Sequence, residues 1–159
     1  VEISALADKY NISLLSDLCV EGIDEELKPE TACEMLQSCD RLNASSLKER
    51  CLETIFSEPL KALPGAFVLK SSLLDEILSS PQLCIGDFPL ANIILELSKN
   101  PAAAGFKKEV PGMLSRHVQF AALTQEEHSK LLCLADSVGC KPEVQGMLLH
   151  TNRGVLTTD

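Results

Sequence analysis

The sequence of 159 residues contains no tryptophan and only one tyrosine, and aromatic residues make up 4% of it. A hydrophobic core must therefore be built from aliphatic side chains and cysteine. No stretch is long and apolar enough to span a bilayer, and no signal peptide pattern is present. Gly-rich phosphate-binding motifs and closely spaced Cys or His pairs are also missing, so we expect no nucleotide site, no metal site and no cofactor.

Positive charge is scarce as well, because 14 Lys and Arg residues stand against 23 Asp and Glu residues, giving a formal net charge of -9. Nucleic-acid affinity comes mainly from cations that neutralise phosphates, so we expect neither nucleic-acid binding nor binding to an anionic membrane. The seven cysteines are odd in number and scattered along the chain. This pattern is typical of reduced thiols in a cytoplasmic or nuclear protein rather than of a disulfide framework.

Helical periodicity is what the sequence does contain, and it is clearest in residues 29–56. Two amphipathic helices are predicted there, separated by a turn at Asn43, with possible capping boxes at Thr31 with Glu34 and at Ser46 with Glu49. Such a hairpin has one apolar side and needs a second layer to cover it. The residues of its apolar stripes are Ala32, Met35, Leu36, Cys39 and Leu42 in the first helix and Leu47, Cys51, Ile55 and Phe56 in the second.

A copy of this hairpin precedes it and could supply that layer. Residues 8–23 align with residues 40–55, so that Asp8, Asn11, Ser13, Leu15, Cys19, Glu21 and Ile23 match Asp40, Asn43, Ser45, Leu47, Cys51, Glu53 and Ile55. The match predicts tandem helical hairpins stacked side by side. In the first copy we expect two sets of side chains to face inward, namely Ile3, Leu6, Ala7 and Tyr10, and Leu14, Leu15, Leu18 and Cys19.

The rest of the chain also favours short helices, and strand patterns are poor throughout, so the predicted class is all-α with stacked antiparallel hairpins. Pro59, Pro64 and Gly65 predict a subdomain boundary within residues 57–64. The chain opens at Val1 inside a helical pattern, which predicts a piece of a longer protein. Two further helices are expected before residue 100, one that starts at Ser71 or Ser72 and stops at Pro81 and one over 88–99 with Asp87 as its cap. A loop is expected at 102–109. Three more helices are expected after it, over 110–117, from a capping box at Thr124 and Glu127 to Gly139, and over 143–150.

A resemblance to a known family rests on several short motifs in order. They are Leu6 to Tyr10 followed by Leu14, Leu15 and Leu18; Leu47, Lys48, Cys51 and Leu52; Phe67, Leu69, Lys70, Ser71 and Ile77; and Met113, Leu114, Val118, Phe120, Leu123 and Glu127. With these residues the chain resembles the C-terminal part of BTB domain proteins. The resemblance implies C-terminal helices of a BTB region at 1–28, a 3-box-like hairpin at 29–58, a BACK-like helical domain at 59–151 and a flexible tail at 152–159.

What the resemblance implies for function is a non-catalytic adaptor. Similar proteins recruit substrates to cullin-3 ubiquitin ligases and connect a BTB domain to a substrate-binding domain. The expected partner is therefore a cullin N-terminal region, and any dimerisation is expected through an upstream BTB domain. An independent helical-repeat scaffold, of the tetratricopeptide or HEAT kind, and a transcriptional or cytoskeletal scaffold of the BTB type stay open as alternatives.

A groove between the two helices of residues 29–56 is the predicted partner-binding site. The alternative for its residues is that they are simply core, which is the usual fate of apolar residues at helical spacing. A hydrolase built on Cys84 and a histidine is disfavoured because no Gly-rich elbow surrounds any candidate. No enzyme activity is expected. The six residues assigned to the groove are Met35, Cys39, Leu42, Leu47, Cys51 and Ile55.

Overall fold

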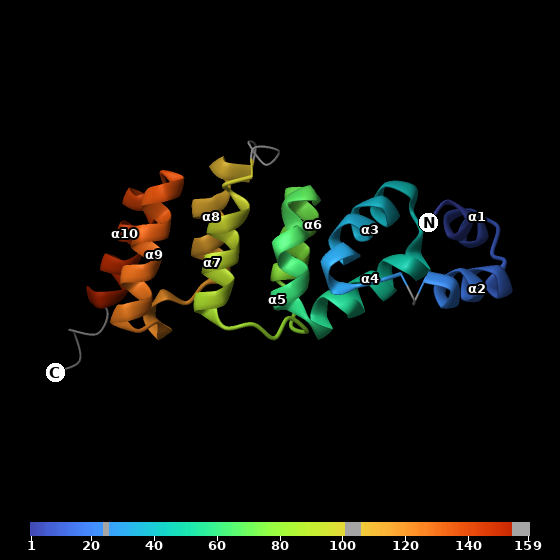
Figure 1. The fold of residues 1–159 in the computed structure, drawn as a ribbon, viewed down its shortest axis with the longest axis horizontal. Helices are drawn as coiled ribbons and strands as arrows, with labels where there is room; N and C mark the ends of the chain where they lie inside the picture. The colour runs from blue at the N-terminus through green and yellow to red at the C-terminus, as the bar shows by residue number, and fades with distance from the viewer. Residues whose placement is uncertain (24–25, 101–105, 154–159) are drawn as a thin grey trace. The chain divides into compact units, whose positions relative to one another are not determined.

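The computed structural model describes residues 1–23, 26–100 and 106–153, and every regular element in these ranges is a helix (Figure 1). The predicted all-α class is confirmed. Contacts divide the chain into two compact units, Val1–Cys84 and Ile85–Asp159. Within the described residues, no helix combines the length and the apolarity that crossing a membrane requires.

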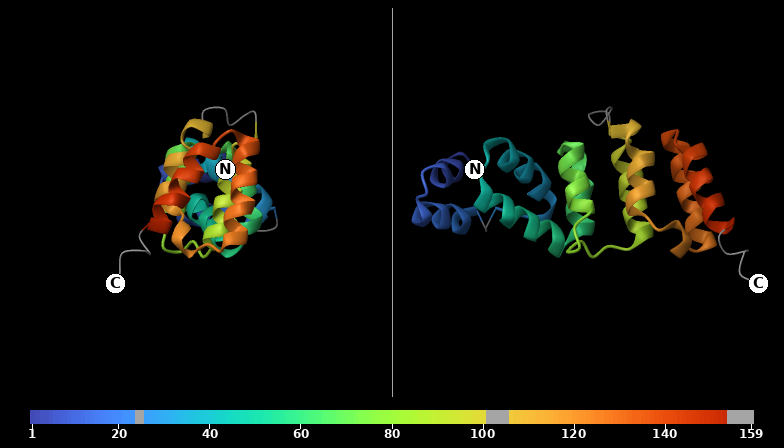
Figure 2. Two further views of the ribbon diagram at one scale, coloured as in Figure 1. Left: turned by 90° about the vertical axis from the view of Figure 1, so that its left-hand side faces the viewer. Right: turned by 180° about the vertical axis from the view of Figure 1, so that it is seen from behind.

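The first unit begins with two helical hairpins that contact each other. The first hairpin consists of α1 (Glu2–Lys9) and α2 (Ser13–Ile23), and the second consists of α3 (Pro29–Leu42) and α4 (Ser45–Ser57). Both α1 and α2 contact α4, and α1 also contacts α3, as the two views from opposite sides show (Figures 1 and 2). The unit continues with α5 (Pro59–Ala62), the 3-10 helix η1 (Leu63–Val68) and α6 (Ser71–Leu78).

The boundary predicted at residues 57–64 differs from the division that the structure makes at Cys84 and Ile85. The reason is that α5 and η1 turn back onto α3 instead of leaving it. The Cys33 thiol on α3 donates a hydrogen bond to the carbonyl oxygen of Ala62 at 3.3 Å. A Cβ atom placed on Gly65 would lie 3.3 Å from the carbonyl oxygen of Glu30, so glycine allows this close approach.

Helix α6 confirms the predicted pattern of buried residues, since Leu73, Leu74, Ile77 and Leu78 are all in the core. In contrast, two of the predicted start signals are wrong. Thr31 is the third residue of α3, where its hydroxyl accepts a hydrogen bond from the backbone N–H of Lys28. Ser46 is the second residue of α4 and is bound by a side chain from another helix, as described below.

The second unit has two helix pairs that share a core. Helix α7 packs against α8 and α9, and α9 packs against α10. Thr124 and Glu127 form the predicted capping box at the start of α9, whereas Asp87 accepts a hydrogen bond from the backbone N–H of Gln119 at 2.7 Å. The elements are α7 (Asp87–Leu97), η3 (Phe106–Lys108), α8 (Val110–His117), η4 (Phe120–Ala122), α9 (Gln125–Val138) and α10 (Lys141–Arg153).

Two predicted irregular segments are only partly covered by the structure. Of the loop expected at 102–109, residues 102–105 lie outside the described residues, and Phe106–Lys108 form η3. Of the tail expected at 152–159, residues 154–159 lie outside the described residues, and α10 extends to Arg153.

Three hairpin turns have the same backbone geometry. Asn11, Asn43 and Gly139 each adopt a positive φ, of 53°, 56° and 78° respectively, within two residues of the end of a helix. In each turn the next residue donates its backbone N–H to a carbonyl five residues earlier, which is the bond of a Schellman motif. These bonds run from Ile12 to Ala7 (2.9 Å), from Ala44 to Cys39 (3.0 Å) and from Cys140 to Ala135 (2.9 Å). The predicted duplication therefore extends to the backbone.

Candidate protein-interaction surface

The structure places most of the predicted groove residues inside the core. Cys39, Leu47, Cys51 and Ile55 are each 0% exposed, so they cannot line a surface groove for a partner. Met35 and Leu42 are half-buried. The physical reason is that the apolar stripes of α3 and α4 face each other, and α5 and η1 also pack against α3. The alternative interpretation of these residues as core applies to the four buried side chains.

Two of the thiols in this core, Cys33 and Cys51, have raised pKa values. Desolvation raises the pKa of Cys33 to about 12. The pKa of Cys51 is also raised, first because its thiol hydrogen-bonds Cys39 and second because it is buried. Thiolates are the nucleophilic form of cysteine, so both side chains are poor nucleophiles at neutral pH.

An apolar surface lies instead on the first hairpin, where the inward orientation predicted for most of the large side chains is wrong. Ala7 is buried and Leu15 and Cys19 are half-buried, but five other members of the predicted inward sets are exposed. Among them, Leu14 is 71% exposed and Leu6 is 53% exposed. We call these five residues the outer face, and they are Ile3, Leu6 and Tyr10 of α1 and Leu14 and Leu18 of α2.

Helical spacing explains why these residues share a surface. Ile3, Leu6 and Tyr10 are three and four positions apart, and Leu14 and Leu18 are four apart, so each set forms a stripe along its helix. The second hairpin covers mainly a different side of each helix, where Ser4, Ala7 and Ser16 are buried. The two stripes that sequence periodicity predicted to be core are therefore exposed to solvent.

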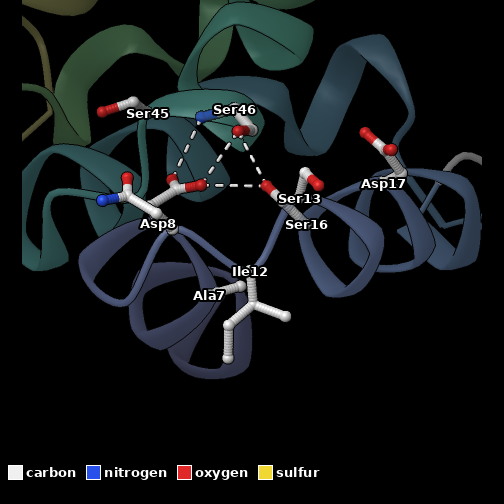
Figure 3. A pocket seen from close by; sticks show the side chains of 9 residues that line it. Ala7, Asp8, Ile12, Ser13, Ser16, Asp17, Ser45 and Ser46 are labelled. Carbon is white, nitrogen blue, oxygen red and sulfur yellow. Dashed lines mark hydrogen bonds between the residues drawn. The ribbon is translucent and has the colours of Figure 1, made fainter.

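The side of the first hairpin that faces the second hairpin is polar and is organised by Asp8. The Asp8 carboxylate accepts hydrogen bonds from the Ser16 hydroxyl at 2.9 Å, the Ser46 hydroxyl at 2.9 Å and the Ser46 backbone N–H at 3.2 Å. The hydroxyl oxygens of Ser16 and Ser46 also lie 2.8 Å apart, so the two serines and Asp8 form one hydrogen-bonded cluster. Figure 3 shows these side chains converging from α1, α2 and α4, with Ile12 pointing away from them.

Asp8 thereby caps a helix to which it does not belong. Ala44, the residue before α4, provides no side-chain cap, so the first N–H groups of α4 need an acceptor from elsewhere. Asp8 supplies a negative charge at this positive end of the helix dipole. Partial burial alone would raise the pKa of Asp8, but the hydrogen bonds from Ser16, Ser46 and Ser45 outweigh it and lower the pKa.

Asp40 occupies the duplicate position and bonds Lys48 of its own hairpin and Lys70, the residue before α6. Its carboxylate accepts hydrogen bonds from the ammonium groups of Lys48 and Lys70, each at 3.3 Å. These bonds lower the pKa of Asp40, with Lys48 contributing most. Each aspartate thus joins its hairpin to a later segment of the chain. The sequence match marked both aspartates, but neither partner could be read from local spacing.

Neither a metal-binding cluster among the described residues nor similarity to a known protein indicates a function. In residues 1–23, 26–100 and 106–153, no group of three or more His, Cys, Asp or Glu side chains is placed to hold a metal ion. Comparison of the chain with protein-family models, with curated proteins and with solved structures gives no match. The assignment of function therefore depends on the outer face and on the sequence resemblance.

Proposed function

We propose that this chain is a non-catalytic protein–protein interaction module that binds its partner through the outer face. The single observation that carries this proposal is the exposure of five large apolar side chains on one hairpin, including Leu14 at 71% and Tyr10 at 66%. Isolated exposed apolar residues are common on soluble proteins, but several large ones on a single helical hairpin are typical of a binding surface.

In its finer form, the proposal is that the module is an adaptor segment of a cullin-3 ubiquitin ligase substrate receptor. In this role it would link a BTB domain to a substrate-binding domain, in the cytoplasm or the nucleus. The support is the resemblance of its ordered motifs to the region that follows the BTB sheet, together with the all-α architecture. All seven cysteines are free thiols, which is in keeping with a reducing compartment.

Titration of the chain with the purified N-terminal region of cullin-3 tests the adaptor role. We expect a complex by isothermal calorimetry or sedimentation velocity at concentrations up to about 100 µM, the range of weak specific interactions. A complex that is lost in the variant L6S/L14S/L18Q would also assign the contact to the outer face. No complex at that concentration would contradict the adaptor role, and an unchanged affinity of the variant would contradict the assigned surface.

A matched control is available within the same unit. Leu60 is 59% exposed but lies on α5, away from the first hairpin in the chain, so L60S removes one exposed leucine without altering the outer face. Its affinity should equal that of the wild-type chain. Circular dichroism of both variants should match the wild type, because the replaced side chains are in solvent.

One observation favours a second candidate, an independent helical-repeat scaffold. The same turn occurs at Asn11, Asn43 and Gly139, and each time an Asp stands three residues before it, as Asp136 does before Gly139. Repeated hairpins of one geometry are typical of helical-repeat proteins. The cullin titration separates the two candidates, since a scaffold of this kind has no reason to bind cullin-3.

A further inference from the structure

The duplication shows what kind of element the outer face is built to receive. Position by position, its residues Ile3, Leu6, Tyr10, Leu14 and Leu18 match Met35, Ser38, Leu42, Ser46 and Arg50 of the second hairpin, at a constant offset of 32 residues.

In the second hairpin, three of these matching positions, Ser38, Leu42 and Ser46, lie on the side where the first hairpin sits. The backbone N–H and the hydroxyl of Ser46 both donate hydrogen bonds to Asp8 of α1. Ser38 and Leu42 border a surface depression together with Glu2 and Ile3 of α1. The equivalent side of the second hairpin is therefore a docking side for helices, and the outer face repeats it one hairpin earlier.

The outer face differs from that docking side in being more apolar. Leucine at positions 6, 14 and 18 replaces Ser38, Ser46 and Arg50. A partner of the outer face therefore needs an apolar stripe rather than the polar contact that Asp8 provides to Ser46. An amphipathic helix laid on two other helices presents such a stripe.

The exposed charge of the first hairpin indicates which charges the flanks of this partner carry. Of the exposed charged side chains on α1 and α2, Glu2, Asp17 and Glu21 are acidic, and Lys9 is the single base among those the structure describes. Lys9 lies over the ring of Tyr10, with its ammonium 5.6 Å from the ring centroid. Basic residues flanking a partner stripe would be attracted to this surface, whereas a second copy of the same acidic hairpin would be repelled.

We propose that the outer face binds an amphipathic helix of another protein that carries Lys or Arg residues on both sides of its apolar stripe. This inference rests on the proposed interaction function and specifies its partner. The helix lies across α1 and α2 in the place that the first hairpin occupies on the second. Its apolar residues cover Leu6, Leu14 and Leu18, and its cations face Glu2, Asp17 and Glu21.

Two fluorescein-labelled synthetic peptides test this assignment. Both are amphipathic helices of about 18 residues with the same leucine stripe, and one carries Lys flanks while the other carries Glu flanks. Measured by fluorescence anisotropy with the full chain, the Lys peptide should bind at least about ten-fold more tightly than the Glu peptide, and added salt should reduce this difference.

Variants then separate docking on the outer face from general attraction to an acidic protein. L6S/L14S/L18Q should weaken binding of the Lys peptide by at least about ten-fold while L60S leaves it unchanged. E2Q/D17N/E21Q should lower the affinity for the Lys peptide and leave that for the Glu peptide the same or higher. The peptide preference, its salt dependence and these variant effects together would support the proposal.

Three outcomes would overturn it. Equal affinity for the two peptides would remove the charge argument, and an unchanged affinity of L6S/L14S/L18Q would place binding elsewhere. Self-association of the wild-type chain in sedimentation velocity, abolished by the same triple variant, would assign the outer face to a second copy. The cullin titration is independent of these readouts, so a failure to bind cullin-3 with the peptide results intact would remove only the adaptor role.

Discussion

The first and second hairpins share turn geometry and spacing but distribute their polar side chains in opposite ways. In the first, Ser4 and Ser16 are buried, and the Ser4 hydroxyl has no hydrogen-bond partner among the described residues. In the second, Leu36 takes the place of Ser4 and is 0% exposed. Leucines lie on the outside of the first hairpin at positions where the second has serine and arginine.

This contrast indicates that the two hairpins are stabilised in different ways. The second hairpin has an apolar interior and a polar docking side, so its stability comes from its own core. The first hairpin has little apolar interior, and it is held to the second by a polar junction at Asp8. Because its apolar area is turned outward, the first hairpin gains stability when a partner covers it.

The largest expected difference between the copies concerns their matched core leucines. Leu47 is 0% exposed, so Leu47→Ala should lower the free energy of unfolding by about 2–5 kcal/mol. Leu15, its match, is half-buried, and Leu15→Ala should cost less than about 1.5 kcal/mol. Urea unfolding followed by circular dichroism measures both. Equal losses would show that the first hairpin has a core as dense as that of the second.

Matched cysteines give a second comparison, in reaction rate. Cys51 is 0% exposed, whereas Cys19 is half-buried. Alkylation by iodoacetamide, followed by mass spectrometry of peptides, should label Cys19 at least about ten-fold faster than Cys51, because Cys51 reacts only after local opening. Exposed Cys84 and Cys133 serve as fast references. Similar rates at Cys19 and Cys51 would mean that the second hairpin opens as readily as the first.

The matched aspartates should differ by a smaller amount. Asp8→Ala removes a helix cap and should cost about 1 kcal/mol at pH 7, whereas Asp40→Ala removes partly exposed ion pairs and should cost about 0.5 kcal/mol or less. The pKa of Asp8 is lowered on folding, so its contribution is present above the unfolded pKa of about 4 and is lost as the pH falls through the folded value.

Unfolding measured at several pH values therefore checks the Asp8 prediction. Wild type and Asp8→Ala should differ in stability at pH 7 and converge toward about pH 3, below the ordinary carboxyl pKa. A gap between them that stays constant with pH would show that the Asp8 charge does not stabilise the junction.

The smallest differences in stability between matched variants of the two hairpins are expected at the turns, where the backbone geometry is the same. Asn11→Ala and Asn43→Ala should each cost about 1 kcal/mol, because alanine at a positive φ is strained. Asn11→Gly and Asn43→Gly should stay within about 0.5 kcal/mol of the wild type. Thermal unfolding of the four variants tests this. A large loss in either glycine variant would mean that the asparagine side chain, rather than its backbone conformation, is what the turn requires.

Much of the fold could be predicted from the sequence because it depends on local signals. The turn at Asn43, the match of residues 8–23 to 40–55, and the capping box at Thr124 and Glu127 were all correct. Periodicity also identified the buried face of α6. Helical spacing and cap chemistry act over a few residues, so one sequence is sufficient to detect them.

The candidate site could not be predicted in the same way, because it depends on what covers each stripe. Periodicity groups Ile3, Leu6 and Tyr10 on one face of α1, but it does not tell whether another layer lies against them. The same limit applies to Cys39 and Ile55, whose stripes were assigned to a groove and are core. The bond from Asp8 to Ser46 joins residues 38 positions apart and leaves no local sequence signal.

The way Asp8 reaches across to α4 sets an order of assembly for the unit. The start of α4 gains its cap when α1 and α2 lie against it, so the N-terminal end of that helix should be the last part of the second hairpin to become protected during refolding. A protease that nicked the chain between the hairpins would then loosen both, since each holds a group the other needs.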